Sequence, residues 1–416
     1  MYAKEGFVTV ALSWILMSIF GSFPFILSGA IPIFFDAFFE TVSGFTTTGA
    51  SILNDVEVLP KSLLMWRSFT HWIGGMGVLV FLMAILPLSG SGNMFLMKAE
   101  SPGPSVSKLV PKVKSTAMLL YTIYIAFTIL EIIILLICGM DLFSAITLSF
   151  GTAGTGGFGV LKSSIGSYSP AVQYVITIFM ILFGVDFSLY YAFFFRKAKN
   201  PFKSAELRAY LGVIFLSIAI IFFNTRGYFG GVEEAIRHIS FTVGSIITTT
   251  GYTTVDFDLW PELSKTIVVM LMFCGACAGS TGGGIKVSRI IILFKSIAKE
   301  IRTNAHPRTT LKIKMNGRPI EHETVRGVNV FMAAYVVIFA SALLIISCDN
   351  FDFTTNFTAI AATINNIGPG LGGVGPTCNF SGYSYFSKFI MSICMLVGRL
   401  EIFPMLLLFS PHAWKK

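Results

Sequence analysis

Charged residues are scarce in this sequence. Lys, Arg, Asp and Glu make up 12% of the 416 residues, whereas hydrophobic residues make up 54%. Soluble domains average about 25% charged residues, so this composition excludes a soluble globular protein. Together with a mean hydropathy of +0.76, it predicts an all-α polytopic membrane protein that sits in a lipid bilayer.

The sequence also lacks the short segments of alternating hydrophobicity that a membrane β-barrel requires. It has long apolar runs instead, and a transmembrane helix needs about 20 such residues. We therefore expect spanning helices over residues 7–30, 72–88, 117–138, 171–195, 209–223, 329–347 and 386–409.

Residues that could carry covalent or metal chemistry are few and scattered. The chain has five histidines and six cysteines, and they form no cluster with carboxylates and no nucleophile–base pair. Cys274 and Cys277 form a CxxC motif, but no second pair or nearby histidine completes a metal site. We expect no enzymatic activity and no cofactor bound by this chain.

Basic residues gather in every second connection between the apolar runs. This is the positive-inside pattern of membrane proteins, so the net charge of +9 does not indicate a nucleic-acid partner. We expect a multi-pass protein of the cytoplasmic (inner) membrane with both termini in the cytoplasm. The basic connections run from Lys98 to Lys114, from Arg196 to Arg208 and from Lys295 to Arg326.

The same pattern of segments occurs four times along the chain. Each unit has an apolar helix, a short segment of about 8–12 residues, a Gly-rich break and a second apolar helix. A segment of that length is too short to cross a bilayer and fits a re-entrant half-helix. The units are expected at 1–95, 96–198, 199–315 and 316–416. The predicted fold is therefore four helix–pore loop–helix repeats around a central pore.

The breaks carry Thr and Gly, which are poor helix formers. We align Gly49, Gly156, Gly251 and Gly368 as equivalent, with Gly370 as the alternative in the fourth unit. Unwound backbone at membrane depth survives where it lines a watery cavity, and four such loops can point carbonyl oxygens at a cation. The residues predicted to bind it are Thr47, Thr48, Gly49, Thr155, Gly156, Thr249, Thr250, Gly251, Asn366, Ile367 and Gly368.

Acidic residues are expected near the outer mouth of this pore. They would lend it a negative potential that concentrates cations, although for any single one of them an ordinary solvated loop charge is the favoured interpretation. These residues are Asp36, Glu40, Glu233, Glu234, Asp256 and Asp258.

A second Gly-rich break interrupts the last helix of the third unit. Residues 275–289 read GACAGSTGGGIKVSR, which is superficially similar to a phosphate-binding loop. Ile285 stands where that motif needs lysine, and Val287 follows Lys286 where it needs Ser or Thr. A break in the helix below the pore loops is the better interpretation, because Gly-rich backbone can switch conformation at low cost.

These motifs together resemble the pore subunits of the Trk/Ktr/HKT potassium-transporter superfamily, most closely its bacterial TrkH type. The resemblance rests on TTTGA (46–50), TGGFG (155–159), TTTGY (248–252), NNIGPGLG (365–372), WRSFTHWIGGMGVLVFLMAILPL (66–88), residues 275–289 and GRLEIFP (398–404). In that family, glycine at the filter position of all four units goes with potassium preference. The resemblance thus implies K⁺ as the transported ion, and the alternative is a sodium or unselective monovalent cation transporter of the same fold.

The resemblance also implies a gate and two protein partners. The gate would be an intramembrane loop that blocks the pore, together with Arg399; its residues are Gly279, Ser280, Thr281, Gly282, Gly283, Gly284 and Lys286. The partners would be a second copy of the chain, giving a homodimer, and a TrkA-like cytoplasmic nucleotide-binding regulatory ring.

Several residues keep more than one interpretation. Arg399 could instead pair with Glu401 or Asp186, and Lys286 could either anchor the loop or extend toward the cytoplasmic interface. For Arg67 and His71 we favour structural hydrogen bonding. Asp186, Glu131 and His71 are the titratable residues expected within the membrane, and no relay joins them. The sequence therefore favours neither proton symport nor downhill flux.

Overall fold

The structure is a computed structural model that describes residues 3–77, 113–194, 203–307 and 311–414. The described chain is mostly helical. Its strands form a small hairpin, in which β1 (Lys314–Met315) pairs antiparallel with β2 (Arg318–Pro319). Asn316 and Gly317 form its two-residue turn with positive φ angles of 52° and 79°, which suits the Asn-Gly pair.

Each predicted unit begins with a long apolar helix. Among the described residues, no other single helix is long and apolar enough to span a membrane. The four helices are α1 (Ala3–Leu27), α6 (Val113–Ile137), α10 (Ala205–Asn224) and α14 (His322–Ile346). The predicted spans at 7–30, 117–138, 209–223 and 329–347 are thereby confirmed as helices.

A short helix follows each long one. These half-helices are α2 (Phe34–Phe45), α7 (Leu142–Gly154), α11 (Val232–Ile247) and α15 (Phe353–Ile364). Asp141 and Asp352 cap two of them, accepting hydrogen bonds from the backbone N–H groups of Ser144 and Thr355 at 2.9 and 3.0 Å. The Ser144 N–H also lowers the pKa of the Asp141 carboxyl. All four carry an acidic residue at the cap or in the first turn, where a negative charge stabilises a helix.

The second long helix of the later units is broken. The expected continuous spans at 171–195 and 386–409 are wrong. The first consists of α8 (Pro170–Phe183) and α9 (Phe187–Phe194), bent by 91°. The second consists of α16 (Tyr385–Arg399) and α17 (Phe403–Leu408), followed by α18 (Pro411–Trp414).

Each break has a local cause. Asp186 accepts hydrogen bonds from the backbone N–H and hydroxyl of Ser188, which starts α9 anew. Glu401 and Ile402 have φ angles of 60° and 68°, which a right-handed helix cannot contain. In the first unit, α3 (Lys61–Met76) covers the start of the predicted 72–88 span, and residues 78–88 lie outside the described part.

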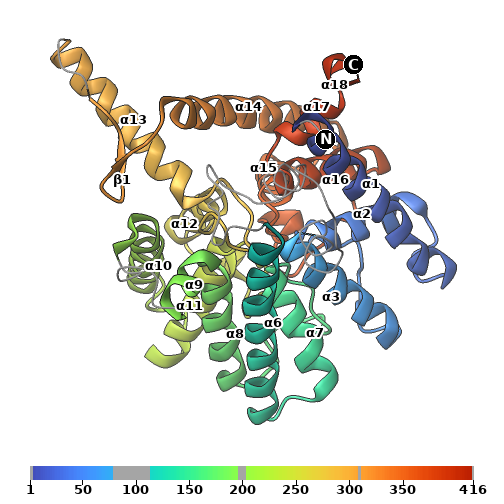
Figure 1. The fold of residues 1–416 in the computed structure, drawn as a ribbon. Helices are drawn as coiled ribbons and strands as arrows, with labels where there is room; N and C mark the ends of the chain where they lie inside the picture. Colours follow the sequence, from blue (N-terminus) through green and yellow to red (C-terminus); the bar gives the residue numbers. More distant parts are fainter. Residues whose placement is uncertain (1–2, 78–112, 195–202, 308–310, 415–416) are drawn as a thin grey trace.

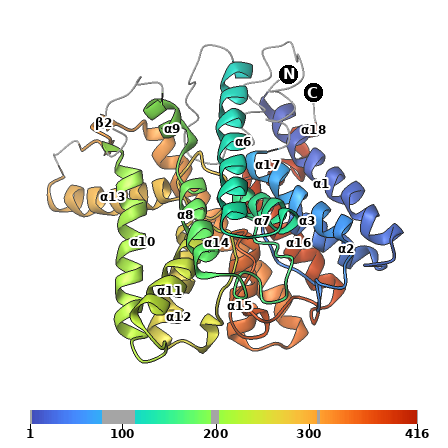
Figure 2. The ribbon, with the colours of Figure 1, turned by 90° about the horizontal axis from the view of Figure 1, so that it is seen from below.

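The half-helices pack into a ring. Each contacts the helix after the break of the preceding unit: α7 contacts α3, α11 contacts α8, α15 contacts α12 (Glu262–Cys274) and α2 contacts α16. Figure 2 shows α7 beside α6 and α11 beside α10, while α13 (Val287–Ala305) projects from the bundle in Figure 1. The arrangement places the ends of the four half-helices near one axis.

The proposed unit boundaries at 95/96 and 198/199 lie outside the described residues. The boundary at 315/316 falls in the turn of the β1–β2 hairpin.

Candidate functional site

Each half-helix ends in the same hydrogen-bonded turn. Four short segments at the ends of these helices are named as follows: loop 1 is Thr46–Gly49, loop 2 is Gly154–Gly157, loop 3 is Thr248–Gly251 and loop 4 is Asn365–Gly368. In each, the N–H of the third residue donates to the carbonyl five positions back, which closes a Schellman turn. The bonds are Thr48 to Ser43 at 2.9 Å, Gly156 to Gly151 at 2.8 Å, Thr250 to Ser245 at 2.8 Å and Ile367 to Ala362 at 2.9 Å.

The second residue of each loop is left-handed although it is not glycine. The φ angles are 55° for Thr47, 55° for Thr155, 59° for Thr249 and 56° for Asn366. Left-handed backbone costs roughly 1–2 kcal/mol for such residues, and for β-branched threonine it is an outlier that points to a function. The side chains at this position are fully buried.

The fourth residue of each loop is a glycine with positive φ. These glycines are Gly49 (79°), Gly157 (79°), Gly251 (83°) and Gly368 (95°). The sequence alignment was therefore one residue off in the second unit, because Gly157 and not Gly156 is the equivalent of Gly49. In the fourth unit Gly368 holds this position, and the alternative Gly370 does not.

The four glycines lie against one another's loops in a closed circle. A Cβ atom added to any of them would overlap the carbonyl oxygen of the third residue in the next loop, so a side chain has no room. The pairs are Gly49 with Gly156, Gly157 with Thr250, Gly251 with Ile367 and Gly368 with Thr48. The structure thus brings all the predicted loop residues together around one axis.

One side of this ring opens into a depression of about 140 Å³. Its lining includes Gly49, Gly157, Gly251 and Gly368, together with the chain that leaves each loop. We call this side the mouth side.

The predicted gating loop closes the other side. It runs from Gly275 to Lys286, between α12 and α13. The N–H of Gly283 donates to the Thr249 hydroxyl at 2.6 Å, and the N–H of Gly284 donates to the Asn365 carbonyl at 3.1 Å. The loop is therefore hydrogen-bonded directly to loops 3 and 4.

Arg399 joins the gating loop to the ring. Its guanidinium donates to the Thr281 carbonyl at 2.9 Å and to the Thr47 hydroxyl at 3.3 Å. It also donates to the carbonyls of Gly74 and Gly75 at the end of α3. Glu401 binds Arg289 instead, in an ion pair that the sequence did not predict.

Lys286 does not extend toward the surface. Its side chain is 1% exposed and its ammonium group donates to the Gly282 carbonyl within the loop. The interpretation of Lys286 as an interfacial, solvent-reaching side chain is therefore wrong. The Asp186 carboxylate packs against Gly279 of the same loop. It leaves no room for a side chain there, because an added Cβ atom at Gly279 would lie only 2.7 Å from it.

Sequence reasoning missed Glu206, at the start of α10. One of its carboxylate oxygens accepts from the N–H of Ala278 at 2.7 Å and from the N–H of Ser288 at 3.1 Å. The carboxylate thus joins the first part of the gating loop to the first turn of α13. The available signal was an acidic residue in the first helical turn, two positions after the N-cap residue Ser204 in a basic link.

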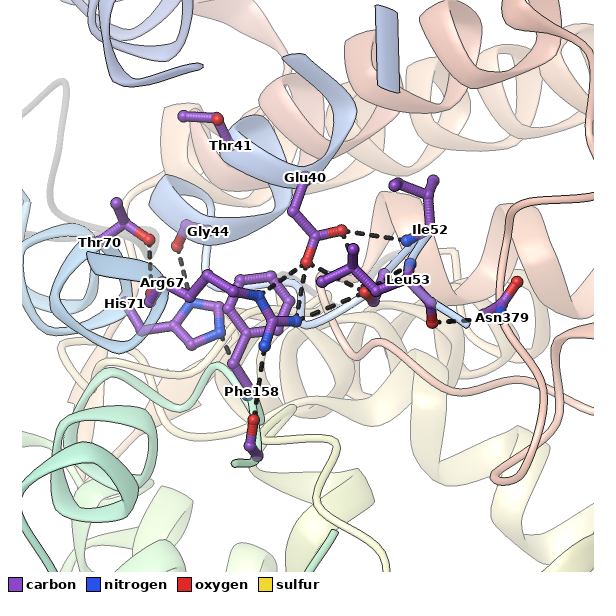
Figure 3. A network of polar contacts seen from close by, with 12 residues as sticks. Glu40, Thr41, Gly44, Ile52, Leu53, Arg67, Thr70, His71, Phe158 and Asn379 are labelled. Atoms are coloured by element: carbon purple, nitrogen blue, oxygen red, sulfur yellow. Dashed lines mark hydrogen bonds and ion pairs between the residues drawn. The ribbon is translucent and has the colours of Figure 1, made fainter. Parts of the chain in front are cut away.

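Three of the acids expected to charge the mouth are already in ion pairs, among them Glu233, which binds Arg237 at 3.0 Å. Glu40 is 1% exposed and binds Arg67, with 2.7 Å between the carboxylate and the guanidinium. Asp36 binds Lys388 at the same distance. His71 hydrogen-bonds the Gly44 carbonyl through Nδ1 at 2.7 Å, so the structural role expected for Arg67 and His71 is confirmed (Figure 3).

Comparisons with known proteins show the family to which the chain belongs. The family model described as a cation transport protein, TrkH, matches residues 1–416. The chain is 37% identical to the Trk system potassium uptake protein TrkH of Escherichia coli, over 100% of this chain and 86% of that protein. It is 35% identical to TrkG of the same organism, over 99% and 86%.

A solved structure is similar over the same extent. The crystal structure of the potassium transporter TrkH from Vibrio parahaemolyticus superimposes with a TM-score of 0.88 at 34% identity, covering 100% of this chain and 86% of that one. This chain therefore belongs to the TrkH family of cation transport proteins.

Proposed function

We propose that this chain is the pore subunit of a potassium uptake system, with loops 1–4 as its selectivity filter. The observation that carries the proposal is the closed circle in which each loop's third carbonyl lies against the next loop's glycine. Such carbonyls can replace the hydration shell of a monovalent cation. The C-terminal ends of four half-helices, each worth about half a negative charge, favour a cation at the same place.

Several observations favour K⁺ over Na⁺ as the transported ion. Glycine occupies the fourth position of all four loops, so no side chain narrows or replaces the carbonyl ring. The relatives are named potassium uptake proteins. A sodium or unselective transporter of the same fold is the rival that the experiment below separates.

The gating loop gives this pore a closed state. Gly283, Gly284 and Arg399 bond directly to loops 3, 4 and 1, so ions can pass only after the loop moves. Arg399 also adds a positive charge beneath the ring, which opposes a cation there.

Orientation and partners follow from the charge distribution. We place the chain in the inner membrane, with α13, the hairpin and both termini in the cytoplasm, because the basic residues of the third link lie on α13 and the hairpin. This surface would receive the nucleotide-binding regulatory ring, and a second copy would complete a homodimer. K⁺ is cargo here, bound by backbone carbonyls.

Cation flux into proteoliposomes tests the filter. The purified chain is reconstituted without a regulatory partner, and K⁺, Rb⁺, Na⁺ or Li⁺ gradients of equal size are applied across the vesicle membrane. The Arg399→Ala variant is measured in parallel, so that flux can be detected if the closed loop blocks the wild type. We expect K⁺ and Rb⁺ to pass and Na⁺ and Li⁺ to be excluded. Equal entry of Na⁺ would establish the rival, and no flux from either protein would contradict a pore.

Replacing Glu206 tests the gating loop. In Glu206→Gln the hydrogen bonds from the two N–H groups no longer have a charged acceptor, which weakens them by about 1 kcal/mol in total. The closed position of the gating loop becomes less stable by that amount, so K⁺ flux is expected to rise by roughly fivefold. The matched control is Glu262→Gln at the start of α12, whose side chain is 88% exposed. Unchanged or lower flux in Glu206→Gln, with normal folding, would mean that this carboxylate does not hold the loop closed.

A further inference from the structure

The first half-helix carries an ion pair that is almost completely dehydrated. The Glu40 and Arg67 side chains are 0% and 2% exposed, and their closest atoms lie 2.7 Å apart. A second bond joins Arg67 Nε to the same carboxylate oxygen at 2.9 Å. Buried ion pairs gain little net stability, because desolvation offsets attraction, so stability alone does not explain this one.

Glu40 holds the chain directly after Gly49. Its carboxylate accepts from the Ser51 hydroxyl at 3.0 Å and from the Ile52 N–H at 3.0 Å. The two residues that leave loop 1 toward the mouth are thereby fixed to the half-helix that precedes the loop.

Arg67 reaches from this carboxylate to the chain after loop 2. Its guanidinium lies 3.9 Å from the centre of the Phe158 ring and donates to the Gly159 carbonyl at 3.4 Å. His71, one turn later on α3, also joins α2 to the chain after loop 2. Its Nδ1 hydrogen-bonds the Gly44 carbonyl at 2.7 Å, and its Nε2 accepts from the Phe158 N–H at 3.3 Å. Figure 3 shows Arg67 and His71 between Glu40 and Phe158.

The arrangement is peculiar to loops 1 and 2. The residue seven positions before the left-handed loop residue is Glu40 in the first unit. In the other units it is Leu148, Thr242 and Ala359, none of which is charged. Among the described residues, the circle of carbonyls is thus fourfold, whereas the Glu40–Arg67 pair contacts the exit segments of loops 1 and 2 alone. The ion pair of Asp36 with Lys388 joins the helices α2 and α16 and not their loops.

We propose that Glu40 and Arg67 are positioning residues for ion selectivity, which fix the spacing between loops 1 and 2. The inference rests on the filter function proposed above. A carbonyl ring can accommodate a smaller ion when its loops are free to approach each other. A rigid, planar guanidinium held between the two exit segments resists that approach, so it excludes Na⁺ without contacting the ion.

The experiment compares Glu40→Gln and Arg67→Lys with the wild type. The initial rates of K⁺ and Na⁺ flux into proteoliposomes give the K⁺/Na⁺ ratio, and thermal unfolding is followed on the same samples. We expect the K⁺/Na⁺ ratio to fall by about tenfold in both variants. This corresponds to a change of about 1.4 kcal/mol in the difference between the free-energy barriers for K⁺ and Na⁺. Glu262→Gln, at the exposed i,i+3 pair with Lys265 on α12, is the control and should keep the wild-type ratio.

Ser51→Ala is a milder variant that tests the same network if the two charge variants do not fold. It removes one hydroxyl from the network and leaves both charges paired. The ratio should fall in the same direction, by about threefold. Wild-type ratios in the folded variants, combined with a lowered ratio in Gly49→Ser, would overturn this inference and leave the filter assignment standing. An unchanged ratio in Gly49→Ser as well would overturn both, and an equal fall in Glu262→Gln would overturn the inference by showing that the effect is not specific to this pair.

Discussion

The variant Gly49→Ser is expected to reduce the K⁺/Na⁺ flux ratio by at least about tenfold. Gly49 has a φ angle of 79° and an added Cβ would overlap the Gly156 carbonyl oxygen. Left-handed strain of roughly 1–2 kcal/mol adds to that overlap, so loops 1 and 2 must shift and the carbonyl circle must open. The ratio is measured from initial K⁺ and Na⁺ fluxes into proteoliposomes.

Gly29→Ser is a matched control for this experiment. Gly29 also has a positive φ angle, of 74°, but no atom lies within 4 Å of its added Cβ. The backbone strain is therefore similar, while the steric overlap is absent. A K⁺/Na⁺ ratio that is unchanged in Gly49→Ser, or that falls equally in Gly29→Ser, would contradict the role of loop 1 in selectivity.

Replacing Arg399 by alanine is expected to raise K⁺ flux without a regulatory partner by tenfold or more. The change removes the bonds to the Thr281 carbonyl and the Thr47 hydroxyl, which join the gating loop to the ring. It also removes a buried positive charge from the path of a cation, a change of at least about 1.4 kcal/mol at low dielectric. Rb⁺ uptake into proteoliposomes measures the effect.

Arg399→Lys separates the two contributions. Lysine keeps the positive charge but cannot bond several carbonyls with one planar group, so an intermediate flux is expected. Arg237→Ala, at a partly exposed position on α11, should leave flux at the wild-type level. If folded Arg399→Ala protein conducts no better than the wild type, Arg399 does not keep the pore closed.

Much of the architecture could be predicted because it depends on composition and spacing. The four long apolar helices and the short segments after them need only hydrophobic length, and the Gly-rich loop shows its composition directly. The breaks in α8–α9 and α16–α17 could not be predicted. They depend on one carboxylate cap at Asp186 and on positive φ angles at Glu401 and Ile402. Single charges mark both places in the sequence, but a charge within an apolar run does not by itself specify a break in the helix.

Register and pairing were also beyond the sequence. In loop 2 three consecutive candidates, Thr155, Gly156 and Gly157, fit a Thr-Gly pattern, and only backbone angles select Gly157. Glu40 resembles any other acid near a membrane surface, because its partner Arg67 lies 27 positions away. Pairing between distant residues is set by packing, and packing leaves no local signature in one sequence.

The circular packing of the half-helices has a consequence for biosynthesis. The circle closes between α2 and α16, through the ion pair of Asp36 with Lys388 at 2.7 Å and the bond from the Phe380 N–H to the Ser51 carbonyl at 2.9 Å. α2 leaves the ribosome more than three hundred residues before α16, so it must wait in the membrane with one face uncovered. During that interval the nascent chain is an incomplete circle, and one face of α2 stays uncovered until α16 arrives.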